Sequence, residues 1–292
     1  MGDPALAFAT AYDSSFRSMT VGYSHNEIPL FRAMHKCLIG LGNKHFEVEE
    51  HHGTSHQVKF TGNGSYARMK ARCELSDLMI ITFSSHAKLA RLTYLQAKSE
   101  RATLASVCQR EFSANLEQWF LLAKRPKING AGKFQPPADL LSGALLPSVG
   151  SFAFFYKDTA GDFQTYYAAA NYMNIPGSHT QRYGKLQATG PCHVSQSRAH
   201  TECLAACGNF AFARSLFRLE IGTPIDHSAP LAAQSVRAWL SSILRARIQA
   251  GQSDVARSNL AQELLLVLGS DIEGNSDGSF GAKHLIIIKS DT

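Results

Sequence analysis

The sequence contains no apolar run long enough to cross a lipid bilayer, which takes about 20 consecutive residues in a helix. The nearest candidate, residues 140–156, is interrupted by Pro147 and Gly150. The first residues also lack a basic stretch followed by an apolar one, the pattern of a secretory signal. These absences predict a soluble, cytoplasmic protein without a membrane partner.

Several common catalytic signatures are also missing. No Walker or dinucleotide-binding glycine loop is present. Ser148 and Ser151 stand in SVGS, which is not the G-x-S-x-G turn of hydrolases. Only six cysteines occur in 292 residues, so free thiols in a reducing compartment are expected. The net charge of +6 is compatible with a polyanionic partner without indicating one.

What is present is a pair of predicted buried strands in residues 74–98. Residues 78–83 form a nearly continuous apolar run, and Asp77 directly precedes it. In residues 92–98 the alternation places Gln96 and Lys98 on one face. A carboxylate and a second oxygen ligand can hold Mg²⁺, and an ammonium group beside them can orient a metal-bound water and offset phosphate charge.

The arrangement of Asp77, eighteen intervening residues and then Gln96-Ala97-Lys98 resembles the motif of the PD-(D/E)XK nuclease superfamily. It matches the variant in which Gln replaces the second acid, as in Mrr-like restriction enzymes. The resemblance implies that Asp77 and Gln96 bind Mg²⁺ or Mn²⁺ and that Lys98 positions the attacking water. The alternative is that Asp77 ends a turn, Gln96 faces solvent and Lys98 is an ordinary lysine at a strand end.

Glu27 is the candidate for a further metal ligand. It lies near the start of a helix predicted over residues 24–41, on the apolar face seven residues before Met34. An acid from the first helix often joins the metal site of PD-(D/E)XK nucleases, and Glu27 matches that position. The alternative is that Glu27 closes a capping box with Ser24.

The predicted fold class is α/β, with a restriction-endonuclease-like core whose mixed β-sheet is flanked by helices. We assign residues 1–125 to this core: a strand or loop lead-in over residues 1–23, the helix over 24–41, a strand meander and a helix over 104–123. The meander includes a hairpin at Asn63-Gly64. Residues 126–292 are predicted to be an α+β elaboration packed on the core as one compact unit.

A basic loop follows the second predicted helix. It carries Lys124, Arg125, Lys127 and Lys133 without an acidic residue, in a segment rich in Gly and Pro. Such a loop is typical of contacts with nucleic-acid phosphates. A lysine-rich surface turn has the same composition, so both interpretations stay open.

A cluster of possible zinc ligands lies in residues 192–207. His200, Cys203 and Cys207 share one face if this segment is helical, and Cys192 or His193 would complete four ligands. Small cysteines in an alanine-rich segment more often serve as packing residues.

The leading hypothesis is a Mg²⁺-dependent endonuclease that hydrolyses DNA phosphodiester bonds. The family resemblance implies bacterial restriction or phage defence, and partners such as a second copy of the chain or a helicase or sensor subunit. The alternatives are a catalytically inactive nuclease-like module that binds DNA or a partner, and a zinc-stabilised scaffold.

Overall fold

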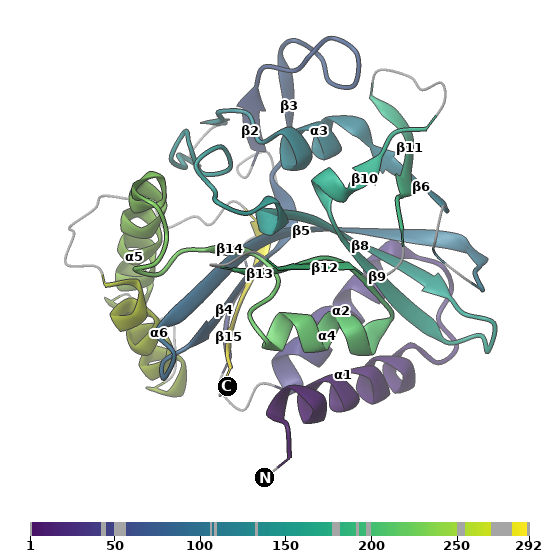
Figure 1. Cartoon of the computed structure of the whole chain (residues 1–292), viewed down its shortest axis with the longest axis horizontal. Helices are drawn as coiled ribbons and strands as arrows, with labels where there is room; N and C mark the ends of the chain where they lie inside the picture. Colours follow the sequence, from purple (N-terminus) through teal and green to yellow (C-terminus); the bar gives the residue numbers. More distant parts are fainter. Residues whose placement is uncertain are drawn as a thin grey trace.

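The structure is a computed structural model of the chain (Figure 1). It describes residues 2–41, 45–49, 57–105, 107, 110–131, 134–176, 182–190, 193–196, 200–249, 255–269 and 282–290. These residues form a mixed α/β fold whose central sheet is flanked by helices. No helix within these ranges is long and apolar enough to span a membrane.

The central sheet has eight strands in the order β1-β15-β4-β5-β8-β9-β13-β12. Their bounds are β1 (His45–Glu49), β15 (Ala282–Lys289), β4 (Ser76–Ser84), β5 (Leu89–Thr103), β8 (Gly150–Lys157), β9 (Phe163–Ala169), β13 (Thr201–Cys207) and β12 (His193–Gln196). The short β14 (Thr223–Pro224) also pairs with β5. The sheet is mixed, because β15 runs parallel to β4 and β8 runs parallel to β5, whereas β4 and β5 are antiparallel.

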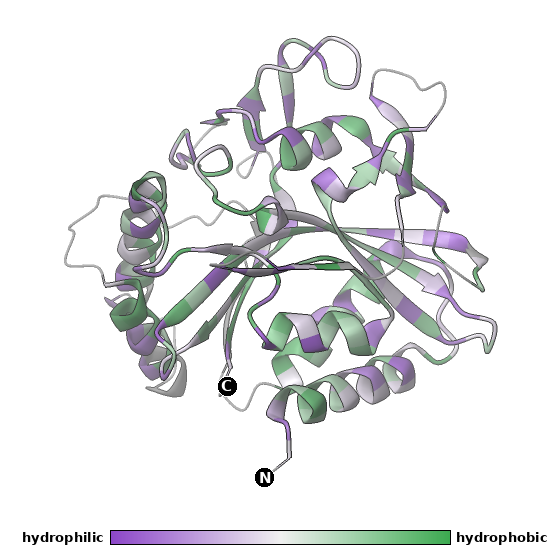
Figure 2. Ribbon diagram, in the orientation of Figure 1, coloured by the Kyte–Doolittle hydropathy of each residue, from purple (hydrophilic) through white to green (hydrophobic). Residues whose placement is uncertain are grey.

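Helices cover both faces of this sheet, because alternate strand residues point to opposite sides. On one face Leu78, Ile80 and Leu95 belong to an apolar core with α1 (Pro4–Thr20), α2 (Glu27–Leu41) and α4 (Asn209–Phe217). On the other face Met79, Ile81 and Tyr94 belong to a second core with α3 (Leu116–Lys124), α5 (Gln234–Gln249) and α6 (Val255–Leu268). In Figure 2, β5 changes from hydrophobic to hydrophilic residues toward its end.

Helix α3 packs closely on the start of β8. A Cβ atom added at Gly150 would lie 2.7 Å from the carbonyl oxygen of Leu122, so only glycine fits there without a shift of the backbone. The order β5, α3, β8 is thus a crossover between two parallel strands.

Two small antiparallel sheets lie outside the central one. They have the orders β3-β2-β7 and β10-β11-β6. Their bounds are β3 (Ala71–Glu74), β2 (Gln57–Phe60), β7 (Asn129–Gly130), β10 (Met173–Asn174), β11 (Tyr183–Ala188) and β6 (Glu111–Asn115). The predicted continuous meander is therefore wrong, since β2 and β3 pair with each other in a separate sheet. No strand forms at residues 66–69, because Asn63 Oδ1 accepts hydrogen bonds from three following backbone N–H groups and holds a wide loop.

Three further sequence predictions are corrected. The lead-in over residues 1–23 contains helix α1, which begins at Pro4 after Asp3 accepts the Ala5 N–H. The helix predicted over 104–123 is confined to α3, because the preceding β6 pairs with β11 and Asn115 caps the helix start. The segment 201–207 is strand β13 and not a helix, because it pairs with β9 and β12.

Other elements are confirmed within small shifts of their bounds, among them α2, β4, α5, α6 and β15. The strand predicted over residues 92–98 is confirmed as β5, but it is longer at both ends and runs from Leu89 to Thr103. The central sheet takes strands from both sides of residue 125, which was the predicted boundary. The second half of the chain therefore completes the same sheet that carries Asp77, Gln96 and Lys98.

Candidate active site

Asp77 and Gln96 meet at the point where β4 begins. The register pairs Leu78 with Leu95, which places Asp77 opposite Gln96 on the neighbouring strand. The Gln96 amide nitrogen donates to Asp77 Oδ2, and the backbone N–H of Ala97 donates to the same oxygen over 3.0 Å. Both side chains are buried, at 5% exposure for Asp77 and 2% for Gln96. The prediction that these two residues come together is thus supported by geometry, whereas the alternative of a solvent-facing Gln96 is wrong.

A third polar residue extends this pair into a row. Gln118, from helix α3, donates from its amide nitrogen to Gln96 Oε1 over 2.9 Å. The hydrogen bonds therefore run in one direction, from Gln118 to Gln96 and from Gln96 to Asp77. Gln118 is itself buried. We call Asp77, Gln96 and Gln118 the closed cluster.

Lys98 lies at the adjoining edge and pairs with Glu27. Its Nζ is 3.3 Å from each carboxylate oxygen of Glu27 and 2.7 Å from the Ala97 carbonyl oxygen. Glu27 is the first residue of α2. The side chains of Lys98 and Glu27 are 18% and 39% exposed. We call this ion pair, with the pocket beside it, the open cluster.

Ala97 connects the two clusters. Its N–H group contacts Asp77, while its carbonyl oxygen contacts Lys98. A carboxylate, an amide and an ammonium group are thereby gathered around one residue of β5. Glu27 reaches this point through its contact with Lys98.

The structure also bears on the interpretation of Glu27 as a residue that caps helix α2. The N–H of Ile28 donates to Asn26 Oδ1 over 3.2 Å, so Asn26 supplies a side-chain acceptor at the start of α2. The carboxylate of Glu27 is directed to Lys98 instead.

The closed cluster fits Mg²⁺ on one condition. The ion prefers oxygen ligands, but Gln96 turns its amide nitrogen toward Asp77. A half-turn of the Gln96 amide would bring its carbonyl oxygen to Asp77 and its nitrogen to Gln118. A matching half-turn of Gln118 would then supply an acceptor, so the hydrogen bond between the two glutamines is kept in reversed direction. With this paired rotation, Asp77 and Gln96 can serve as the two oxygen ligands.

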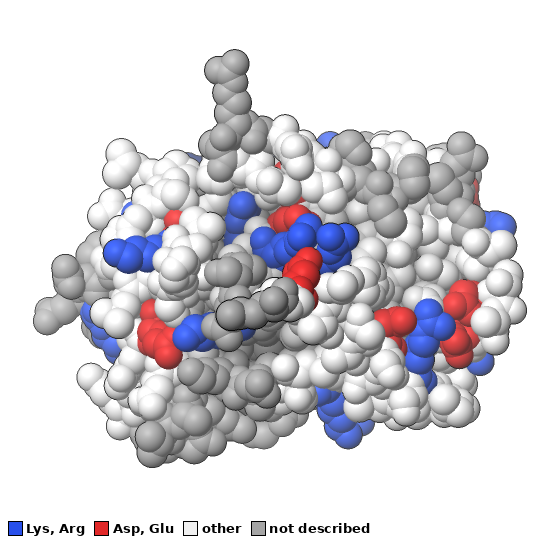
Figure 3. Space-filling view, turned by 60° about the horizontal axis from the view of Figure 1, so that its bottom comes forward, with Lys and Arg blue, Asp and Glu red and all other residues white. Residues whose placement is uncertain are grey.

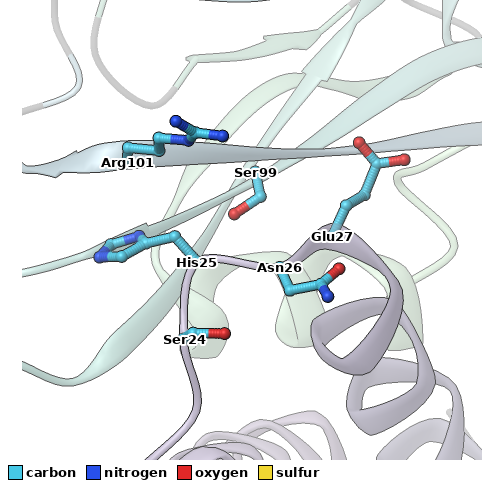
Figure 4. A pocket seen from close by; sticks show the side chains of 6 residues that line it. All are labelled: Ser24, His25, Asn26, Glu27, Ser99 and Arg101. Atoms are coloured by element: carbon cyan, nitrogen blue, oxygen red, sulfur yellow. The ribbon is translucent and has the colours of Figure 1, made fainter.

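An open polar pocket lies beside Glu27, the partner of Lys98 (Figure 4). Its volume is about 550 Å³. It lies between the segment that leads into α2 and the last residues of β5, and it is lined by Ser24, His25, Asn26, Glu27, Ser99 and Arg101. Sequence reasoning identified Glu27 alone among these residues, because the others have no periodic pattern that marks them as neighbours.

The predicted basic loop is only partly available for binding. The Lys124 ammonium lies 5.5 Å from the centre of the Trp119 ring, and Arg125 Nη1 donates to the Ala144 carbonyl oxygen over 2.9 Å. Lys127 is exposed. Lys133 lies outside the described residues. The nucleic-acid role of this loop stays a prediction, and two of its side chains have structural partners.

Charges on the visible face in Figure 3 are mixed, with blue and red groups side by side. Ion pairs of this kind are found among the described residues, for instance between Arg17 and both Asp13 and Asp162. Among the described residues on this face, the basic groups thus do not form a continuous stripe of the kind that follows a nucleic-acid backbone.

The helical face proposed for zinc is absent, because residues 201–207 form a strand. Cys203 packs in the core shared with α1 and α2, whereas Cys207 packs against the core on the other side of the sheet. His200 precedes the strand, and Cys192 lies outside the described residues. No group of three or more His, Cys, Asp or Glu side chains able to hold a metal ion occurs among the residues that the structure describes.

Sequence reasoning missed a second feature of α3, a buried glutamate beside Gln118. The Glu117 side chain is fully buried and accepts hydrogen bonds from Arg68 Nε over 2.5 Å and from Arg68 Nη2 over 3.0 Å. Burial by itself would raise the pKa of Glu117, but the paired guanidinium outweighs it and the pKa lies below its ordinary value. The signal in the sequence was Glu-Gln at two successive positions of an otherwise apolar helix, Leu116 to Ala123.

No protein-family model, curated protein or solved structure matches this chain.

Proposed function

We propose that the protein is a Mg²⁺-dependent endonuclease that hydrolyses DNA phosphodiester bonds where β4 and β5 begin to pair. The observation that carries the proposal is the convergence of Asp77, Gln96 and Lys98 around Ala97. The order of helix α2, antiparallel strands β4 and β5, helix α3 and parallel strand β8 adds support, because the resemblance implies a helix, a strand meander and a second helix in that order, and β4 and β5 are the part of that meander found in the central sheet.

In this proposal Asp77 and Gln96 hold the metal ion, and Gln118 sets which atom of the Gln96 amide faces it. When bound, Mg²⁺ would lower the pKa of a water molecule and offset charge on the phosphate. Lys98 donates a hydrogen bond to the attacking water or to a phosphate oxygen. The water oxygen bonds to phosphorus, one bridging P–O bond breaks, and the leaving oxygen takes up a proton.

Glu27 has a different place in this proposal from the one predicted. Its contact with Lys98 makes it the group that holds the ammonium in position. Direct coordination of the metal by Glu27 stays an untested prediction. Mn²⁺ is expected to replace Mg²⁺, because it takes the same oxygen ligands. The bacterial defence setting and a second copy or a helicase or sensor subunit as partner stay proposals that the resemblance implies.

The test is incubation of the purified protein with supercoiled, linear and single-stranded DNA, in Mg²⁺ and in EDTA. Cleavage is expected in Mg²⁺ alone, and at least roughly 100-fold less with Asp77→Asn or Lys98→Met, since each removes a charge from the reacting site. Asp162→Asn is the matched control, because this exposed carboxylate lies in a surface ion pair with Arg17. Equal cleavage by the parent, Asp77→Asn and Lys98→Met would refute the proposal.

A second function from another class has its own support. The amides of Gln96 and Gln118 and the carboxylate of Asp77 already satisfy one another without a metal. This favours an inactive nuclease-like module that binds DNA or a partner. Salt-sensitive DNA binding without metal-dependent cleavage would favour this module over the enzyme.

A further inference from the structure

We propose that the pocket lined by Ser24, His25, Asn26, Glu27, Ser99 and Arg101 binds a backbone phosphate of the nucleic-acid strand, next to the bond that is cleaved. This inference rests on the proposed function, because it places the substrate of the same site. The first reason is the lining, which is polar at every residue and therefore suits a charged ligand better than an apolar one (Figure 4).

The second reason is charge. The Arg101 side chain is exposed, and among the described residues no hydrogen bond or ion pair is found for its guanidinium group, whereas its backbone N–H donates to Glu100. Among the residues that the structure describes, Glu27 is the one acid that lines the pocket, and Lys98 offsets its charge. The pocket thus keeps the guanidinium as a positive group. Guanidinium matches phosphate well, because its parallel N–H groups can contact two oxygens at once.

The third reason is a buried hydroxyl at the back of the pocket. Ser99 Oγ is shielded from solvent and has no hydrogen-bond partner among the described residues. In Figure 4 this hydroxyl points from β5 toward the segment that carries His25 and Asn26. A buried hydroxyl without a partner costs free energy, and a ligand oxygen would supply the missing acceptor.

The fourth reason is the direction of helix α2, beside which His25 is held in a fixed orientation. His25 Nδ1 lies 2.6 Å from the carbonyl oxygen of Glu100, which only accepts, so Nδ1 carries a proton. The ring is fixed by this bond and by edge contact with Phe163. Helix α2 starts at Glu27, so its positive end also faces the pocket. Arg101, Ser99 and this helix end converge from two separate elements.

The position of the pocket links it to the proposed chemistry. Ser99 directly follows Lys98 in β5, and Glu27 both lines the pocket and contacts Lys98. A strand with one phosphate in the pocket would therefore bring a neighbouring phosphate toward Lys98.

The test is binding of a fluorescein-labelled DNA oligonucleotide in EDTA, where cleavage is excluded, followed by fluorescence anisotropy at several salt concentrations. Arg101→Gln is expected to weaken binding roughly tenfold for all sequences, since it removes a charged hydrogen bond. It is also expected to reduce the slope against log salt by about one, since one phosphate contact is lost. Ser99→Asp should weaken binding at least as much, and Ser99→Ala less. Arg72→Gln, on an exposed position of β3, is the control with the same change of charge.

The outcomes separate this inference from the proposed function. Equal binding by the parent, Arg101→Gln and Ser99→Asp, with unchanged melting temperatures, would overturn the pocket assignment even if cleavage depends on Asp77. If Arg101→Gln and Ser99→Asp bind DNA more weakly but the parent protein never cleaves DNA, the pocket assignment is supported and the proposed endonuclease activity is refuted. Inorganic phosphate and a mononucleotide serve as competitors. A different result is that inorganic phosphate or the mononucleotide binds in this pocket while Arg101→Gln leaves oligonucleotide binding unchanged. The phosphate bound in the pocket then comes from a small compound, and its assignment to a nucleic-acid strand is wrong.

Discussion

The closed cluster and the open cluster both contact Ala97, yet they differ in burial and in how their polar groups are satisfied. Asp77, Gln96 and Gln118 are buried and hydrogen-bonded to one another, whereas Lys98 and Glu27 are partly exposed and Glu27 lines an open pocket. Buried polar groups are costly unless every one has a partner, so the closed cluster has a role in stability as well as in any chemistry. The side chains of the open cluster are partly exposed, so water or a ligand can supply hydrogen-bond partners to them. We therefore expect substitutions of Asp77 and Gln96 to affect the stability of the fold as well as any chemistry.

The largest expected effect comes from removing one acceptor of the closed cluster. Asp77→Ala leaves the Gln96 amide and the Ala97 N–H without their buried partner, and should lower the free energy of unfolding by roughly 2–4 kcal/mol. Glu27→Ala should lower it by less than about 1 kcal/mol, because the pair that it breaks is partly exposed. Urea unfolding followed by circular dichroism measures both values. Equal losses for the two variants would remove the distinction between closed and open clusters.

An intermediate effect is expected from fixing the direction of the two glutamine amides. Gln118→Glu presents only an acceptor to Gln96, so the Gln96 carbonyl oxygen should turn toward Asp77. This variant should bind Mn²⁺ more tightly and be less stable in EDTA, where the two oxygens repel each other. Gln118→Leu should weaken Mn²⁺ binding by about tenfold, because residues behind a metal ligand typically contribute that much.

Electron paramagnetic resonance of Mn²⁺ and thermal melting with and without the ion give readouts that do not depend on activity. Gln118→Leu has a side chain of similar size and serves as the control for packing. If the Glu and Leu variants shift Mn²⁺ affinity in the same direction, the paired rotation is wrong.

The smallest effect concerns the acid sensitivity of the ion pair between Glu117 and Arg68, next to Gln118 of the closed cluster. The pKa of Glu117 lies below its ordinary value of 4.5 in the folded protein, chiefly because Arg68 outweighs the effect of burial. A depressed pKa stabilises the fold above the ordinary value, and this contribution is lost as pH falls through the lower folded-state pKa. Glu117→Gln should therefore melt earlier than the parent at neutral pH, and the difference should shrink below pH 4.5. Melting curves over a pH series provide the measurement, and a constant difference at every pH would contradict the assignment.

The sequence predicted β4, β5 and the facing of Asp77 with Gln96 because these features follow from local patterns. A continuous apolar run marks a buried strand, and alternation sets which side chains share a face. The partners that come from elsewhere in the chain left no such pattern. Gln118 contacts Gln96 because α3 lies in the connection from β5 to β8. The longer helix predicted over residues 104–123 gave no indication of this contact. The segment 201–207 shows the same limit, because its small residues suit a helix as well as a strand and pairing with β9 decides.

Strand β15 has a consequence for how the molecule assembles. It inserts between β1 and β4, so the strand that begins beside Asp77 is bordered by β5 on one side and by β15 on the other. Ser76 pairs with Ala282, a separation of about 200 residues, and contacts so distant along a chain are slow to form. During synthesis the edge of β4 that pairs with β15 therefore stays unpaired until nearly all of the described chain has left the ribosome. A chaperone or a neighbouring nascent chain would meet that edge before β15 does.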